Sequence, residues 1–76
     1  MRITLAQYRM AKAALDLTVV ELAALAKVST NTLVRLERGE RLTERTMQRV
    51  QTAFEAAGIE FISEGGGGVG VRLRKR

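Results

Sequence analysis

Apolar residues recur at helical spacing through the first 57 positions of the chain, in four segments separated by short breaks. Each segment follows a hydroxyl residue of the kind that caps a helix N-terminus. These patterns predict helices at 5–15, 19–26, 30–38 and 44–57. The expected N-caps are Thr4, Thr18, Ser29 and Thr43.

An apolar residue stands before every predicted cap, and another stands at the fourth position of every predicted helix, which is the pattern of a hydrophobic staple. The pairs are Ile3 with Tyr8, Leu17 with Leu22, Val28 with Leu33, and Leu42 with Met47. Gln7 and Glu21 each follow a capping threonine by three residues, so the first two helices match the capping box. Gly58, directly after the last helical position, is expected as a left-handed C-cap.

The helical period also predicts which side chains face the core. The expected inward residues are Tyr8, Ala11 and Leu15, then Leu22, Leu25 and Ala26, then Leu33 and Leu36, and finally Met47, Val50, Phe54 and Ala57.

After Gly58 the pattern becomes that of strands. Residues 59–62 are β-branched and aromatic, and residues 69–74 alternate with period two. The glycine run 65–68 lies between them, so we expect an antiparallel hairpin or strand pair. A lone hairpin is marginal in water, and this one must therefore pack on the helices or pair with a second copy.

The composition excludes several kinds of chemistry. The 76 residues contain neither Cys nor His, which removes disulfides, thiolate metal sites and the usual general base. We therefore expect no enzyme, no metal and no cofactor. No signal peptide and no apolar run of about 18 residues is visible, so we expect a soluble, cytoplasmic protein that does not associate with a membrane.

Positive charge is concentrated in parts of the chain. Thirteen Lys and Arg residues against eight Asp and Glu residues give a net charge of +5. The N-terminal 15 residues hold three of the basic residues and no acid, and Arg72–Arg76 is a basic tail. This distribution favours phosphates or an acidic surface as the partner. For the tail, phosphate contact and simple solubility both stay open.

The segment 17–39 predicts two short helices joined by Lys27, Val28 and Ser29, which allow only a sharp turn. Such a corner leaves the N-terminal half of the second helix projecting from the molecule. Its outward side chains would be Thr30, Asn31, Val34, Arg35 and Arg38. Asn suits adenine, Arg suits guanine, and a Thr methyl suits the thymine methyl in a DNA major groove.

This segment resembles the helix-turn-helix of the Cro and lambda-repressor-like (XRE-type) DNA-binding family, and the similarity extends over about residues 3–57. The matching positions are Thr18, Glu21, Leu22-Ala23, Ala26, Val28-Ser29, Leu33, Leu36 and Glu37-Arg38-Gly39. The resemblance implies a mainly α fold, a lambda-repressor-like bundle of four helices, followed here by the C-terminal hairpin. It divides the chain into a helix-turn-helix domain at 1–58 and a strand extension at 59–76.

The resemblance also implies roles for individual residues. The implied base contacts are Thr30, Asn31 and Arg35. The implied phosphate contacts are Thr18, Ser29, Thr32, Arg38 and Arg41. Lys12 and Glu37 occupy the positions of a structural ion pair in the family.

Three positions depart from the family pattern. Val19 stands where the family commonly has Gln. Lys27 replaces a common turn glycine and is therefore expected to adopt a positive φ. At the C-terminus, strand-like sequence replaces the usual fifth helix.

The function expected from these features is sequence-specific binding of double-stranded DNA by a homodimer, acting as a repressor on a palindromic operator. A protein with this function would be associated with the nucleoid. The dimer interface expected from the strand apolar surface comprises Ile59, Phe61, Ile62, Val71 and Leu73. The alternative is a protein-binding module of the same fold, an antitoxin or anti-activator that neutralises a protein partner. Val19, apolar at a usual DNA contact, favours that alternative.

Overall fold

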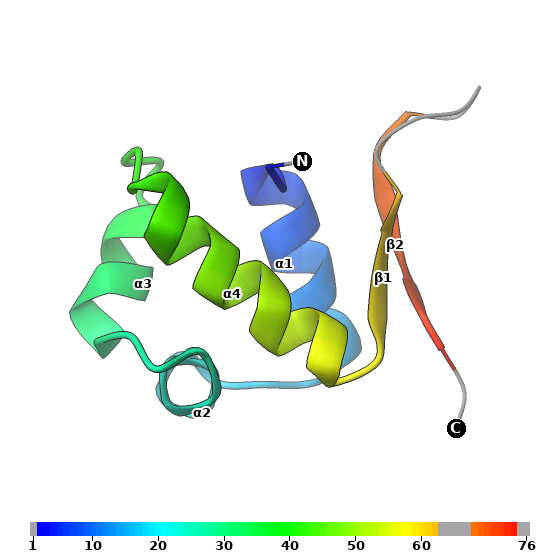
Figure 1. The fold of residues 1–76 in the computed structure, drawn as a ribbon, viewed down its shortest axis with the longest axis horizontal. Helices are drawn as coiled ribbons and strands as arrows, with labels where there is room; N and C mark the ends of the chain where they lie inside the picture. The colour runs from blue at the N-terminus through cyan, green and yellow to red at the C-terminus, as the bar shows by residue number, and fades with distance from the viewer. Residues whose placement is uncertain (1, 63–67, 75–76) are drawn as a thin grey trace.

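The computed structural model describes residues 2–62 and 68–74 of the chain, and Figure 1 shows its fold. Its elements are α1 (Leu5–Ala14), α2 (Val19–Ala26), α3 (Thr30–Glu37), α4 (Glu44–Ala56), β1 (Ile59–Ile62) and β2 (Gly70–Leu73). The predicted fold, a small helical bundle followed by a strand pair, is confirmed. Most of the glycine run, and the last two residues of the basic tail, lie outside the described residues.

All four helices begin at the predicted caps. The side chains of Thr4, Thr18, Ser29 and Thr43 each accept the backbone N–H three residues on. Both predicted capping boxes are present, because the side-chain oxygens of Gln7 and Glu21 accept the N–H groups of Thr4 and Thr18 over 2.9 and 2.8 Å. The helix starts are therefore fixed by contacts within four residues of sequence.

The helices end at residues with positive φ: Asp16, Lys27, Gly39 and Gly58. Gly58, with φ 103°, adopts the predicted left-handed cap after α4. Its carbonyl accepts the N–H of Arg74 over 2.8 Å, so this turn also joins the helical part to β2.

The core is centred on aromatic rings from three elements. Tyr8 of α1 and Phe61 of β1 each meet the ring of Phe54 edge-on, with centroids 6.0 Å apart. Such edge-to-face pairs contribute about 0.5–1.5 kcal/mol beyond the burial of their surface. Leu22 and Leu33, both fully buried, join α2 and α3 to the same core.

One predicted core residue is wrong. Leu25 is 54% exposed, whereas Ala23 of the same helix is 5% exposed. Successive residues of a helix turn by about 100°, and the buried face of α2 is centred between Leu22, Ala23 and Ala26. Leu25 lies well off that centre, which the apolar pattern alone could not reveal because almost every residue of α2 is apolar.

The two strands pair antiparallel, with Ile59 opposite Leu73 and Phe61 opposite Val71. Because side chains alternate between faces, these four share one face, from which Ile59, Phe61 and Val71 pack on the helical core. Figure 1 shows the hairpin beside the helices. On the outer face the Glu60 carboxylate lies 3.6 Å from the Arg72 guanidinium.

Gln7 holds the hairpin against α1. Its side chain is 1% exposed, and its Nε2 donates to the carbonyl of Ile62 over 3.0 Å and to that of Gly70 over 3.1 Å. One amide thus caps α1 through its oxygen and joins both strands through its nitrogen. A glutamate would satisfy the capping box equally well, but it could not donate to the two strand carbonyls.

Two substitutions separate the capping role of Gln7 from its role in holding the strands, because Glu21 has the capping role alone. Gln7→Glu is expected to lower the free energy of unfolding at pH 7 by about 2–4 kcal/mol, because a buried carboxylate would face two carbonyl oxygens. The deficit should shrink as pH falls, since burial raises the pKa of the new carboxyl and its protonated form can donate. Urea unfolding between pH 4 and pH 8 measures both effects.

Glu21→Gln is the matched control, because that box is solvent-exposed. Hydrogen bonds from the Thr18 backbone and side chain hold the pKa of Glu21 below its usual value. A lowered pKa gives stability that is present above the unfolded-state pKa and is lost as pH falls through the folded-state value. Glu21→Gln should therefore remove part of the acid sensitivity with little change at pH 7. Equal losses at pH 7 in the two variants would contradict the role of Gln7 in docking the hairpin.

Candidate nucleic-acid interface

The turn between α2 and α3 sets the direction of α3. Lys27 has φ 58° and ψ 44°, so the expected positive φ is confirmed. The N–H of Val28 donates to the carbonyl of Ala23 over 3.1 Å, which closes α2 as in a Schellman motif. Arg49 of α4 reaches the carbonyl of Lys27 over 3.4 Å and ties the turn to the bundle.

Helix α3 presents one face to the core and the opposite face to solvent. Leu33 and Leu36 are buried, whereas Thr30, Asn31 and Arg35 are exposed. The three residues expected to contact bases therefore lie together on the outer side of one helix. Figure 1 shows α3 at one end of the molecule and the hairpin at the other, so the hairpin leaves this face uncovered.

The start of α3 gathers hydroxyl groups. The Ser29 and Thr32 hydroxyls lie 2.7 Å apart, and the Ser29 oxygen also accepts the Thr32 N–H over 3.0 Å. Ser29 is exposed and Thr32 half-buried, while Thr18 stands exposed at the start of α2. Helix N-termini carry partial positive charge and suit phosphate oxygens.

The loop after α3 adds two exposed arginines, Arg38 and Arg41. Gly39, with φ 90°, reverses the chain, and its N–H donates to the carbonyl of Leu36 over 2.9 Å. Arg38 and Arg41, the predicted phosphate contacts from this loop, thus flank the turn at Gly39.

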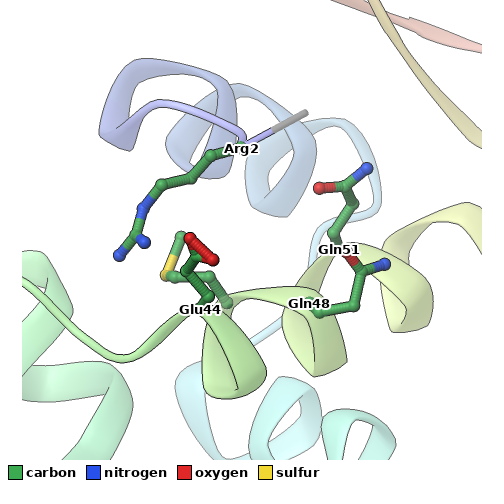
Figure 2. Close-up of a pocket in the computed structure, with 5 residues that line it drawn as sticks. Arg2, Glu44, Gln48 and Gln51 are labelled. Carbon is green, nitrogen blue, oxygen red and sulfur yellow. The ribbon is translucent and has the colours of Figure 1, made fainter.

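A shallow hollow of about 250 Å³ lies beside this loop, between the segment before α1 and the first turns of α4 (Figure 2). Its lining residues are Arg2, Glu44, Met47, Gln48 and Gln51. The Arg2 guanidinium donates to the carbonyl of Leu42, next to Arg41. From the sequence, Arg2 contributed only to the positive charge of the N-terminal segment. In the structure its side chain also holds the loop between α3 and α4 through the bond to Leu42.

The C-terminal end of α3 is anchored to α1 through Glu37. Lys12 Nζ lies 3.8 Å from Glu37 Oε2, and the Tyr8 hydroxyl donates to the same oxygen over 2.7 Å. Arg9 adds a bond to the Glu37 carbonyl over 3.1 Å. Burial, followed by the hydrogen bond to Glu37, raises the pKa of Tyr8 far above its usual value, so the hydroxyl remains a donor.

Lys12 and Glu37 were predicted as a pair from the sequence, whereas the bonds of Tyr8 and Arg9 to Glu37 were not predicted. The signal for Tyr8 was present, because residues four apart share a helix face and Tyr8 precedes Lys12 by four.

Two further predicted residues lie in the fold rather than on a surface. Ile59 is 1% exposed and belongs to the core, so its side chain is not available to a second copy. Val19 is partly buried and packs against the core, which accounts for its apolar character within the monomer.

Within residues 2–62 and 68–74, no three Asp or Glu residues converge as a metal site would require. In the same part of the chain, no helix is both long and apolar enough to cross a bilayer.

This geometry, a short helix fixed at both ends and joined by a tight turn to the helix before it, is that of a helix-turn-helix domain. Residues 5–58 match the model of the family described as Helix-turn-helix. Because the match covers well over half of the chain, the protein belongs to this family, the XRE or lambda-repressor-like helix-turn-helix proteins. Members are DNA-binding regulators of transcription and are not typically enzymes. A comparison with curated proteins gives no match.

The left-handed conformation of Lys27 leads to a prediction about the stability of the domain. Lys27→Gly should raise the free energy of unfolding by about 0.5–1 kcal/mol, because glycine adopts positive φ without the steric penalty of a Cβ. For a domain of this size, 1 kcal/mol corresponds to a shift in Tm of about 4–8 °C, which thermal unfolding followed by circular dichroism resolves.

The matched control is Ala24→Gly, at an exposed position inside the same helix. It should lower the free energy of unfolding by about 1 kcal/mol, the usual cost of glycine in a helix interior. If both glycine variants were destabilised alike, Lys27 would not occupy the left-handed conformation in solution.

Proposed function

We propose that the protein is a homodimeric, sequence-specific regulator that binds a palindromic operator in double-stranded DNA and represses transcription in the cytoplasm. The observation that carries this proposal is the outer face of α3, where Thr30, Asn31 and Arg35 stand exposed on a helix whose ends are both anchored. A helix of this kind fits the major groove, and these three side-chain types suit base edges.

The groups around α3 supply the sequence-independent part of binding. The proposed phosphate contacts are Thr18, Ser29, Thr32, Arg38 and Arg41. Hydroxyls and guanidinium groups that meet phosphates set the register on the duplex and make affinity fall with salt. The net charge of +5 favours the same partner.

A single α3 contacts too few base pairs to select one genomic site. Each mismatch costs about 1–3 kcal/mol, so discrimination requires more base pairs than one helix reaches. Two copies related by a twofold axis double the contacts and require an inverted repeat in the DNA.

The hairpin edge formed by β2 is the proposed contact between copies. The bond from the Arg74 N–H to the Gly58 carbonyl sets the alternation of the ladder. By that alternation Arg72 bonds inward to β1, and the N–H and C=O groups of Val71 and Leu73 point to the free edge. The exposed apolar side chains of Val69 and Leu73 lie at the two ends of this edge.

Side chains of the predicted interface then divide between two tasks. Ile59, Phe61 and Val71 face the helices, so they support the hairpin from within. Ile62 is half-buried on the outer face, and Leu73 is half-exposed at the end of β2. The hairpin therefore favours a dimer in which two copies pair through the backbone of β2, with added contact from Leu73. It does not favour a dimer in which all five side chains of the predicted interface contact the second copy.

Selection of duplexes from random DNA by the purified protein tests the function directly. The expected result is an enriched motif that is an inverted repeat. A motif without symmetry would contradict the dimer, and no enrichment of any double-stranded sequence would leave the protein-binding alternative.

Arg35 and Arg38 should respond differently to truncation on the selected operator. Arg35→Ala is expected to weaken operator binding by about 1–3 kcal/mol and to relax preference at one base pair of each half-site. Arg38→Ala should weaken binding to all duplexes alike and reduce the salt dependence by about one phosphate contact. Fluorescence anisotropy at several salt concentrations measures both. Equal loss on operator and scrambled DNA for Arg35→Ala would remove it from base recognition.

Proline substitutions along β2 test the dimer. Leu73→Pro should yield a monomer with an intact fold, because the lost N–H points to the free edge and edge strands tolerate proline. Arg72→Pro is the control, since its N–H bonds to β1 and its loss should destabilise the hairpin itself. Light scattering gives the oligomeric state and circular dichroism the fold. A Leu73→Pro protein that remains dimeric would place the interface elsewhere.

A further inference from the structure

Two separate contacts join Arg35 to Glu40 at the end of α3. The N–H of Glu40 donates to the carbonyl of Arg35 over 3.1 Å, in the turn that Gly39 closes. The Nε of Arg35 donates to Oε1 of Glu40 over 3.0 Å. The backbone bond fixes the point from which the Glu40 side chain extends, so the carboxylate meets the guanidinium group without ordering a flexible loop.

The side-chain contact uses Nε and leaves the two terminal nitrogens of the guanidinium group. A guanidinium group is a planar fork with five N–H donors. These two terminal nitrogens can together make a bidentate contact with O6 and N7 of guanine. The contact between the Glu40 carboxylate and Nε restricts the orientation of the guanidinium plane. Because the Arg35 side chain is 47% exposed, the donors on its two terminal nitrogens stay accessible.

The charge of Glu40 opposes the phosphate attraction proposed for this loop. Glu40 lies between Arg38 and Arg41, where a carboxylate is repelled by a DNA backbone. A group that lowers affinity for phosphates and also orients a base-contacting side chain favours operator over unrelated DNA, since specificity is a difference between two affinities.

We propose that Glu40 is a positioning residue for base recognition, which orients the Arg35 guanidinium toward a guanine and thereby sets discrimination at one base pair of each half-site. This inference rests on the proposed function of the α3 face. Glu40 acts through Arg35, and its carboxylate makes no contact with the base.

The test uses the 76-residue chain with three duplexes. They are the selected operator, the same operator with the relevant base pair replaced, and a scrambled duplex of equal composition. Binding is followed by fluorescence anisotropy at about 150 mM salt, where surface charges are partly screened. The variants are Glu40→Ala and Glu40→Gln. Glu44→Gln is the control, because it removes one acid nearby in sequence. Within residues 2–62 and 68–74, Arg35 forms its ion pair with Glu40 and not with Glu44.

Glu40→Ala should bind scrambled DNA more tightly than the unmodified protein, while discrimination at the one base pair falls about two- to fivefold, the range for an exposed ion pair. Glu40→Gln should show the same gain on scrambled DNA with a smaller loss of discrimination, because its amide oxygen can still accept from Nε. Glu44→Gln should leave discrimination unchanged.

A double-mutant cycle shows whether Glu40 acts through Arg35. In an Arg35→Ala background, Glu40→Ala should no longer alter discrimination. Discrimination that is unchanged in Glu40→Ala alone, or that falls equally in both backgrounds, would overturn the positioning role while leaving DNA binding in place. An unmodified protein that prefers no duplex would instead overturn the proposed function.

Discussion

Helix α3 has eight residues, and a helix of that length is not stable in water unless its surroundings hold it. Only Leu33 and Leu36 bury fully from α3, because its opposite face is exposed to solvent. Its orientation therefore depends on contacts at its two ends. The left-handed Lys27 and the Ser29 cap fix the start, and the bonds of Tyr8 and Lys12 to Glu37 fix the end.

These two anchors differ in kind. The N-terminal anchor combines the side-chain cap of Ser29 with backbone bonds and one residue of positive φ, Lys27. Strain of this sort persists only where the surrounding structure determines the conformation. The C-terminal anchor is a half-buried carboxylate that accepts from a hydroxyl and faces an ammonium group. Such a pair fixes geometry more than it adds stability, since desolvation offsets much of the attraction. Both anchors reach α3 from helices that are themselves capped by local contacts.

The sequence was sufficient where structure is decided by near neighbours. The caps at Thr4 and Thr18, the positive φ of Lys27 and the end of α4 at Gly58 all depend on residues within a few positions. It was insufficient where contacts join distant segments. Gln7 matched a capping box, but its bonds to Ile62 and Gly70 span more than fifty residues. In the same way Ile59, which the apolar character of the strands assigned to a dimer surface, is buried because β1 packs against α4.

The opposite placement of α3 and the hairpin has a physical consequence for a dimer. A two-stranded sheet is marginal alone, and here Gln7 and the aromatic contact between Phe54 and Phe61 hold it to the helices. Pairing two copies along β2 would extend the sheet to four strands and satisfy backbone groups that otherwise require water. Because the hairpin lies at the far end from α3 (Figure 1), that association would leave α3 of both copies open. DNA that engages both helices at once would then stabilise the sheet by mass action, so operator binding and strand pairing would reinforce each other.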